Sequence, residues 1–232
     1  MIIATHTPEG KKLVRFHKTK THQSYRLKDG SEVPGVSTVL KILNKGEGLM
    51  HWAWDLGRKG EDYRKVRDNS ADIGSLAHFM VECELRGEVA DLSEFSPADQ
   101  EKAANCFKLA MGYIERERFT NIGQEVQLVS EQHGYGGTLD APCLDRDGKY
   151  VLLDWKTSKS IYDEYLLQVS AYRELWNENH PDKQITRSII VRIGKNGDGD
   201  FETREVFNHD KQFDAFKAIL GAHKALSAIR RN

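Results

Sequence analysis

The strongest structural signal in the chain lies in residues 137–156, GTLDAPCLDRDGKYVLLDWK. Its middle, residues 145–148, fits a three-residue hairpin loop whose glycine takes the left-handed conformation. In that register Asp147 is the centre of the loop, so Asp140 and Asp154 lie opposite each other. Their Cβ atoms are then ~4.5 to 5.5 Å apart on one face of the hairpin. The stretch therefore predicts two antiparallel strands that bring two carboxylates together.

Lys156 completes this pattern. It follows Asp154 by two residues, so its side chain emerges on the same face of the strand, while Val151, Leu153 and Trp155 face the other way and can anchor the strand. Two adjacent carboxylates repel unless a cation or a proton lies between them, and Mg²⁺ prefers such oxygen ligands. The ammonium can stabilise charge on a transferring phosphoryl group. A surface hairpin with a plain Asp–Lys pair is the alternative, and the spacing alone leaves both open.

Outside this stretch, apolar residues at helical spacing predict a mostly helical first half. Alternation from Ile122 onward predicts a second half richer in strands. We expect an α+β fold with a mixed central sheet. The elements predicted before Ile122 are a small hairpin (13–17 with 24–28, ending at Asp29-Gly30), a short helix capped by Ser37 and ending at Leu43, and helices over 49–67, after Ser70 and from a capping box at Ser96. Those predicted after it are three consecutive antiparallel strands up to Trp155, a helix from a capping box at Ser160 to Asn179, strands over 185–193 and 201–207, and a helix after Asp210.

The composition bounds the class of protein. The 232 residues suit one integrated domain, and 39% hydrophobic with 30% charged residues is typical of a globular chain. The N-terminal ten residues lack the pattern of a signal peptide and no stretch approaches ~18 apolar residues, so we expect a cytoplasmic protein without a membrane partner. A net charge of -1 announces no polyanion, so any nucleic-acid contact must be local. Three scattered cysteines cannot hold a four-thiolate cluster.

Four further residues are candidates for a site. His78 lies on a predicted helix, where pairing with Glu82 is the plain interpretation. Glu125 precedes the first predicted strand and is next to the Asp140 strand if the two pair. Gln168 and Tyr172 are four residues apart on a helix, so both can point at one spot, although Tyr172 also suits core packing.

Taken together, these motifs resemble the PD-(D/E)XK nuclease superfamily. Gly74-x-x-x-His78, Glu125, Gly137-Thr138-Leu139-Asp140, Leu152-Leu153-Asp154-Trp155-Lys156-Thr157 and Gln168-x-x-x-Tyr172 occur in that family's order. The chain is most similar to the RecB-type exonuclease branch, which includes mitochondrial genome-maintenance exonucleases and phage relatives. The resemblance spans residues 74 to 172 and implies a restriction-endonuclease-like αβββαβ core. Residues 71–232 would form this core, and residues 1–70 an N-terminal hairpin and helical addition that contacts DNA.

The resemblance also implies roles for single residues. His78, Asp140, Asp154 and the backbone carbonyl of Trp155 would bind Mg²⁺ or Mn²⁺. Lys156 would be the catalytic lysine, and Glu125 would support the site as a second-metal or water-mediated ligand. Gln168 and Tyr172 match an element that contacts DNA and braces the site. The four cysteines that hold an iron–sulfur cluster in some relatives are absent, so we expect no such cluster.

Two basic segments are candidates for the local DNA-binding surface, whereas residues 82–101 are strongly acidic and are expected to face away. Near the N-terminus Phe16 and Tyr25 are interleaved with the cations, as in single-strand binders that stack bases. The cations expected to contact DNA are Lys11, Lys12, Arg15, Lys18 and Lys20 in the first segment and Arg64 and Arg67 on the helix before the one that carries His78.

The sequence thus predicts a divalent-metal-dependent DNA exonuclease that hydrolyses phosphodiester bonds by in-line attack of water, on single-stranded DNA or DNA ends. Replication, recombination or repair is the implied setting, with a recombinase or a single-strand-binding protein as a further partner. Two alternatives stay open. One is a structure-specific endonuclease with the same site, and the other is a catalytically silent nucleic-acid-binding module.

Overall fold

The computed structural model describes residues 11–16, 24–43, 46–195 and 200–231. At its centre is a five-stranded sheet in the order β11-β10-β9-β8-β5. The β9–β10 pair is parallel and the other neighbours are antiparallel, which confirms the predicted α+β class with a mixed sheet. The strands of this sheet are β5 (Thr120–Asn121), β8 (Ala141–Leu144), β9 (Tyr150–Lys156), β10 (Ile185–Ile193) and β11 (Phe201–Val206).

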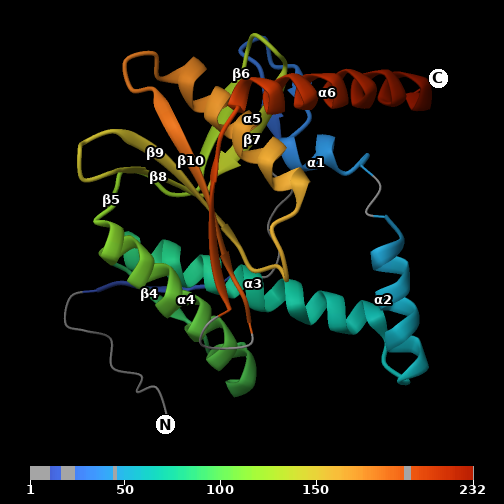
Figure 1. Ribbon diagram of the computed structural model, residues 1–232, viewed down its shortest axis with the longest axis vertical. Helices are drawn as coiled ribbons and strands as arrows, with labels where there is room; N and C mark the ends of the chain where they lie inside the picture. Colours follow the sequence, from blue (N-terminus) through green and yellow to red (C-terminus); the bar gives the residue numbers. More distant parts are fainter. Residues whose placement is uncertain (1–10, 17–23, 44–45, 196–199, 232) are drawn as a thin grey trace.

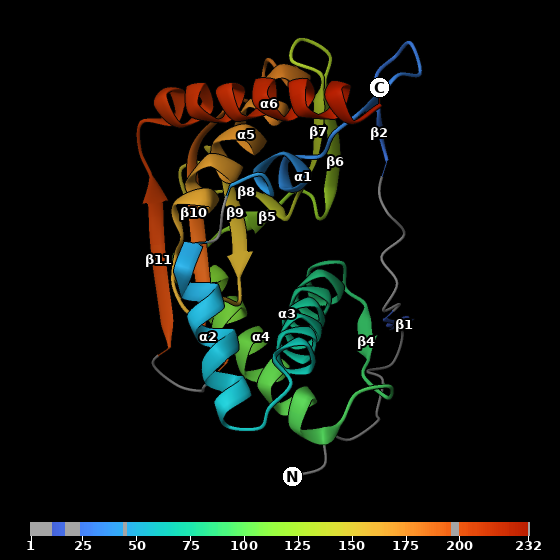
Figure 2. The same ribbon diagram turned by 90° about the vertical axis from the view of Figure 1, so that its right-hand side faces the viewer.

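Helices cover both faces of the sheet (Figures 1 and 2). One core cluster joins the sheet to α1 (Val36–Leu40), α5 (Asp163–Asn179) and α6 (His209–Arg231), and a second joins it to α3 (Tyr63–Leu85) and α4 (Pro97–Glu117). In Figure 2, α2 (Gly46–Arg58) lies with α3 and α4 at the end of the molecule away from α6. None of the helices in the described residues combines the length and apolar character needed to cross a membrane.

Strand β9 shows how the sheet is anchored. Leu152 belongs to the cluster with α5 and α6, whereas Val151, Leu153 and Trp155 belong to the cluster with α3 and α4, as their alternation predicted. Because side chains alternate along a strand, Asp154 projects on the same face as Leu152, toward α5. Two apolar layers therefore fix the end of β9 from both sides.

The hairpin register is confirmed. Ala141 pairs with Leu153 and Leu144 with Tyr150, which centres the loop on Asp147, and Gly148 has φ +73°. However, the strand before the loop is interrupted at Asp140. The residues before it form β7 (Tyr135–Leu139), which pairs with β6 (Val126–Ser130) in a separate two-stranded sheet. Asp140 therefore lies at the junction of two sheets rather than inside one strand.

The predicted N-terminal hairpin is wrong. β1 (Leu13–Arg15) pairs in parallel with β4 (Val89–Asp91). The hairpin that does form joins β2 (Tyr25–Arg26) to β3 (Glu32–Val33). The reason is the Asp29-Gly30 turn, in which Asp29 accepts a bond from the Ser31 N–H and Gly30 takes φ +87°, so that the chain folds back immediately after Arg26.

Two helix boundaries also differ from prediction. The helix expected over 49–67 is divided, since Gly60 at φ +76° follows α2, and Asp62 then caps α3 by accepting from the Arg64 N–H. Arg64 and Arg67 therefore share one helix with His78, and the predicted boundary at residue 70 falls inside it.

Three predicted caps can be compared with the structure. The Ser96 capping box forms, because its side chain accepts from the Asp99 N–H. The Ser160 box does not form, and α5 begins after Tyr162 without a side-chain cap. The first helix ends at Leu40, three residues earlier than expected, and Ser37 is not its cap because the helix begins one residue before it.

Candidate active site

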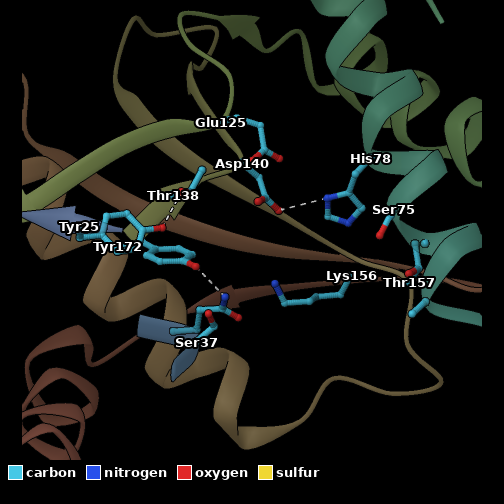
Figure 3. Close-up of a pocket in the computed structure, with 13 residues that line it drawn as sticks. Tyr25, Ser37, Ser75, His78, Glu125, Thr138, Asp140, Lys156, Thr157 and Tyr172 are labelled. Atoms are coloured by element: carbon cyan, nitrogen blue, oxygen red, sulfur yellow. Dashed lines mark hydrogen bonds and ion pairs between the residues drawn. The ribbon is translucent and has the colours of Figure 1, made fainter. Parts of the chain in front are cut away.

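A pocket of about 360 Å³ opens where β9 ends, with α3 on one side and α5 on the other (Figure 3). Most of the residues that sequence analysis singled out for chemistry line it, although they come from five separate segments. The fold therefore brings together candidate residues that lie between positions 78 and 172 of the sequence. The candidates lining the pocket are His78, Glu125, Asp140, Lys156, Gln168 and Tyr172.

Three of these residues form a group that could hold a metal ion. His78, Glu125 and Asp140 each offer one ligand atom, and the three atoms lie within 4.8 Å of one another. His78 Nδ1 is 3.8 Å from Asp140 Oδ2, and the backbone N–H of Trp155 donates to the same oxygen at 2.9 Å. An imidazole with two carboxylates suits a divalent cation that accepts oxygen and nitrogen ligands. The carbonyl of Trp155 as a ligand stays a prediction.

Glu125 is held in an unusual backbone conformation. Its φ is +46°, in the left-handed region, and its N–H donates to the backbone carbonyl of Asp140 at 3.0 Å. This region costs a non-glycine residue ~1 to 3 kcal/mol, so the surrounding structure must impose it. The conformation places Glu125 just before β6 and within the metal group, more centrally than the supporting role expected for it. No pattern in the sequence signals this backbone conformation.

Asp154 lies beside this group but outside it. Its side chain is fully buried, Oδ2 contacts the ammonium of Lys156, and Oδ1 has no hydrogen-bond partner among the described residues. Burial raises the pKa of Asp154, while the Lys156 cation acts against this rise. A buried carboxylate oxygen without a hydrogen bond among the described residues, close to the Asp140 carboxylate, fits a cation at this place. The donor set therefore fits the implied divalent metal.

Lys156 is the cation that the chain itself supplies. Its side chain is 14% exposed, and its Nζ lies 5.1 Å from the centre of the Tyr165 ring. Burial alone would lower the pKa of Lys156, but the carboxylates of Asp154 and Asp140 raise it above its ordinary value. The ammonium therefore keeps its proton at neutral pH and presents a fixed positive charge to the pocket.

The wall opposite His78 is aromatic and polar (Figure 3). Gln168 Nε2 donates to the hydroxyl of Tyr172 at 2.8 Å, and the hydroxyl of Tyr25 is 2.8 Å from Thr138 Oγ1. Glycines make room for both rings, since a Cβ on Gly137 would lie 2.6 Å from the Tyr172 ring and one on Gly136 only 2.3 Å from Tyr25. Sequence reasoning did not place Tyr25 in this wall, although the Gly134–Gly137 run was a signal.

The predicted DNA-contacting cations are divided between two places. Lys11, Lys12 and Arg15 lie beside the acidic segment, so the predicted separation of acidic from basic residues is wrong there. Arg64 and Arg67 are exposed on α3, 14 and 11 residues before His78. At 3.6 residues per turn they share its face of the helix and lie ~21 and ~16 Å from it along the axis. Lys18 and Lys20 lie outside the described residues.

Comparison with known proteins finds only distant likenesses. No protein-family model matches the chain, and no curated protein does. A candidate exonuclease from Eubacterium rectale is 16% identical with a TM-score of 0.42, and the match covers 65% of this chain but 64% of that one, less than two thirds of its length. An alkaline exonuclease from Laribacter hongkongensis is 12% identical with a TM-score of 0.37, over 85% of this chain and 91% of its own. The function therefore has to be argued from the site itself.

Proposed function

We propose that this chain is a divalent-metal-dependent DNA nuclease of the PD-(D/E)XK type, acting as an exonuclease on single-stranded DNA or DNA ends. One observation carries the proposal: the His78–Glu125–Asp140 group opens into the same pocket as the buried Asp154–Lys156 pair. A cation site next to a fixed ammonium is the combination that phosphoryl transfer requires, because negative charge develops on the transferred group.

His78, Glu125 and Asp140 would hold the metal, with Asp154 directly beside them. Mg²⁺ and Mn²⁺ suit this carboxylate-rich set, and either ion, when bound, polarises a phosphate and lowers the pKa of the attacking water. Lys156 neutralises charge that develops on the phosphoryl oxygens, and Asp154 fixes its position. The hydroxyl of Tyr172 accepts from Gln168, so its own proton can be donated into the pocket.

The Tyr172 phenol is suited to this donor role. Burial and the nearby carboxylates of Asp154 and Asp140 raise its pKa well above the ordinary value, so that it remains neutral at neutral pH. Aromatic rings of this wall also offer surfaces on which a base can stack, which supports a nucleic acid as the substrate. Exonuclease rather than endonuclease action rests on the motif resemblance.

Digestion of 5'- and 3'-labelled DNA tests the proposal. Linear single-stranded, duplex and circular single-stranded DNA are incubated with the wild-type chain and with Asp154→Asn, each in Mg²⁺, Mn²⁺ or a chelator. We expect mononucleotides or short products from linear DNA, no cutting of the circle, and no activity in the chelator or in the variant. A cut circle shows endonuclease action instead. Equal digestion by both proteins would refute the assignment.

A further inference from the structure

Lys195, two residues after β10, lies beside the pocket-lining Gly74 and has no carboxylate partner among the described residues. Its Nζ donates to the carbonyl of Ser70 on α3 at 2.7 Å, and the side chain is partly buried. No carboxylate among the described residues forms an ion pair with it, and burial lowers its pKa. A partly buried ammonium held by one neutral oxygen still has two N–H donors to offer.

Two described carboxylates that follow Lys195 closely in the chain are engaged elsewhere. Asp200 binds Arg192 Nη1 at 2.6 Å, and Glu202 binds Arg192 Nε at 3.1 Å. Arg192 itself is the register partner of Lys156 on β10, and it also donates to the carbonyl of Ser158 at 3.4 Å. Arg192 thus engages both of these carboxylates, and neither forms an ion pair with Lys195, so in the described residues the Lys195 ammonium keeps donors for a ligand.

The crevice between α3 and the end of β9 places Lys195 beside the site. A Cβ on Gly74 would lie 2.4 Å from Thr157 Oγ1 and 4.0 Å from Lys195 Nζ, so helix, strand end and ammonium converge there. Gly74, Ser75 and Thr157 all line the pocket. Figure 3 shows Ser75 and Thr157 together on the α3 side of Lys156, away from Tyr172. One ammonium and two hydroxyls thus gather at one end of the pocket.

This group has the chemistry of a phosphate site. Ammonium and hydroxyl donors bind phosphate oxygens, and a cation without an anionic partner gains most from such a ligand. Lys195 lies three residues beyond the register partner of Lys156, which is ~10 Å along the strand direction. Because a nucleic-acid strand carries a phosphate at every nucleotide, a strand that places one phosphate at Lys156 brings a nearby phosphate of the same strand toward Lys195.

We propose that Lys195, together with Thr157 and Ser75, binds a backbone phosphate that flanks the scissile phosphate on the same strand. The inference rests on the proposed function only for the place of the scissile phosphate. It makes this end of the pocket a subsite that sets the register of the strand relative to Lys156, and it gives Lys195 a positioning role.

A scan with methylphosphonates tests this subsite. Oligonucleotides with one neutral linkage, moved stepwise along the strand, are titrated by fluorescence anisotropy into the chain in a chelator, so that no turnover occurs. In the wild type one linkage should weaken binding ~10-fold, the effect of losing one charge-assisted contact. In Lys195→Met the same neutral linkage should weaken binding less than 2-fold. Lys149 is an exposed lysine at the other end of β9, ~23 Å from Lys156 along the strand, and Lys149→Met should keep the wild-type pattern.

Two more variants separate lost contact from lost fold. Lys195→Arg keeps a cation and should retain the effect of that linkage, while Thr157→Val should reduce it. If the scan is the same in the wild type and in Lys195→Met, the subsite does not exist. If the effect of one linkage depends on Lys195 but labelled DNA is not digested in Mn²⁺, the nuclease proposal fails and the subsite stands. If DNA does not bind at all, both proposals fail.

Discussion

Helix α5 separates two buried polar clusters that look alike and behave differently. On one side Asp154 and Lys156 form an ion pair, and on the other Ser170 and His209 lie 3.2 Å apart between α5 and α6. Each cluster contains buried atoms without a hydrogen bond among the described residues. In the first these are the two carboxylate oxygens of Asp154, of which Oδ2 contacts the Lys156 ammonium, and in the second it is His209 Nε2. Unsatisfied buried atoms alone would mark both as sites.

Access and charge distinguish the two. Lys156 lines a pocket, with the carboxylates of Asp140 and Glu125 beside it. Ser170 is fully buried, and its Oγ donates to Gln212 Oε1 at 3.0 Å, so Nδ1 of His209 must donate to Ser170. A serine beside a histidine suggests a nucleophile and its base, but no substrate can reach this hydroxyl. A pocket with complementary charge, rather than a buried polar pair, is therefore what identifies the candidate active site.

The sharpest difference between the clusters should be in catalysis. Lys156→Met removes the cation proposed to face the phosphoryl group, and we expect kcat to fall ~10²- to 10³-fold, as when one preorganised donor is lost. Ser170→Ala should leave kcat within 2-fold. Steady-state digestion of labelled DNA in Mn²⁺ measures both, with Lys149→Met as the lysine control. Comparable losses in Lys156→Met and Ser170→Ala would remove the distinction between the clusters.

Metal binding should stabilise the folded chain through the pocket residues and should not depend on the Ser170–His209 cluster. A ligand that binds only the folded chain adds ~2.7 kcal/mol at 100 times its Kd, so Mn²⁺ should raise the melting temperature of the wild type by several degrees. Asp140→Asn, which removes a member of the ligand group, should lose this shift. His209→Gln should keep it. Differential scanning fluorimetry with and without Mn²⁺ decides the matter, and a full shift in Asp140→Asn would contradict the proposed ligands.

The Ser170–His209 cluster should make the stability of the chain depend on pH. Burial, aided by the Arg173 cation and opposed by Asp210 and Glu205, lowers the pKa of His209 to about 4. The unfolded chain takes up a proton below its ordinary value of ~6.5, so His209 contributes stability above that pH and loses it as the pH falls from 6.5 to 4. His209→Gln should therefore lose ~2 kcal/mol less than the wild type between pH 7 and 4.5 in urea unfolding.

The raised pKa of Asp154 has the opposite effect. Its protonated form is favoured in the folded chain, so its contribution is present at low pH and declines as the pH rises above ~4. Both proteins in the urea comparison carry Asp154, and its contribution cancels in their difference. Parallel stability curves for the wild type and His209→Gln would show that the imidazole is not held neutral by burial.

Much of the site was accessible from the sequence because it depends on local periodicity. The loop centred on Asp147 set the hairpin register, and alternation put Lys156 on the face of Asp154. Local patterns could not show that Asp140 would lie between two sheets, or that Glu125 would take a left-handed backbone and join the metal group. Those features depend on pairings between distant segments, which the spacing of neighbouring residues does not encode.

The basic residues show the same limit. Arg64 and Arg67 were expected on the helix before that of His78, but a glycine and an aspartate cap placed them on its helix. The basic strand near the N-terminus was expected to form a hairpin with residues 24–28, and it pairs instead with the acidic segment at β4. Charge along the sequence predicted which residues are cationic, while the fold decided which of those charges are neutralised.

The smallest expected effect is on DNA binding, where two pairs of cations can be compared. Arg64→Gln/Arg67→Gln removes two cations aligned with His78 on α3. It should weaken binding of a single-stranded oligonucleotide ~3- to 10-fold and lower the salt slope by ~1.4 units, ~0.7 for each lost contact. Lys12→Gln/Arg15→Gln also removes two cations, but these lie 3.7 Å from Glu88 and 2.9 Å from Glu94. Both of these cations are paired with carboxylates, whereas on α3 only Arg67 is, with Asp68 at 2.8 Å, so loss of the β1 pair should change binding less than 2-fold. Anisotropy titrations at several salt concentrations compare the pairs, and a larger loss from the β1 pair would place the DNA along β1 rather than α3.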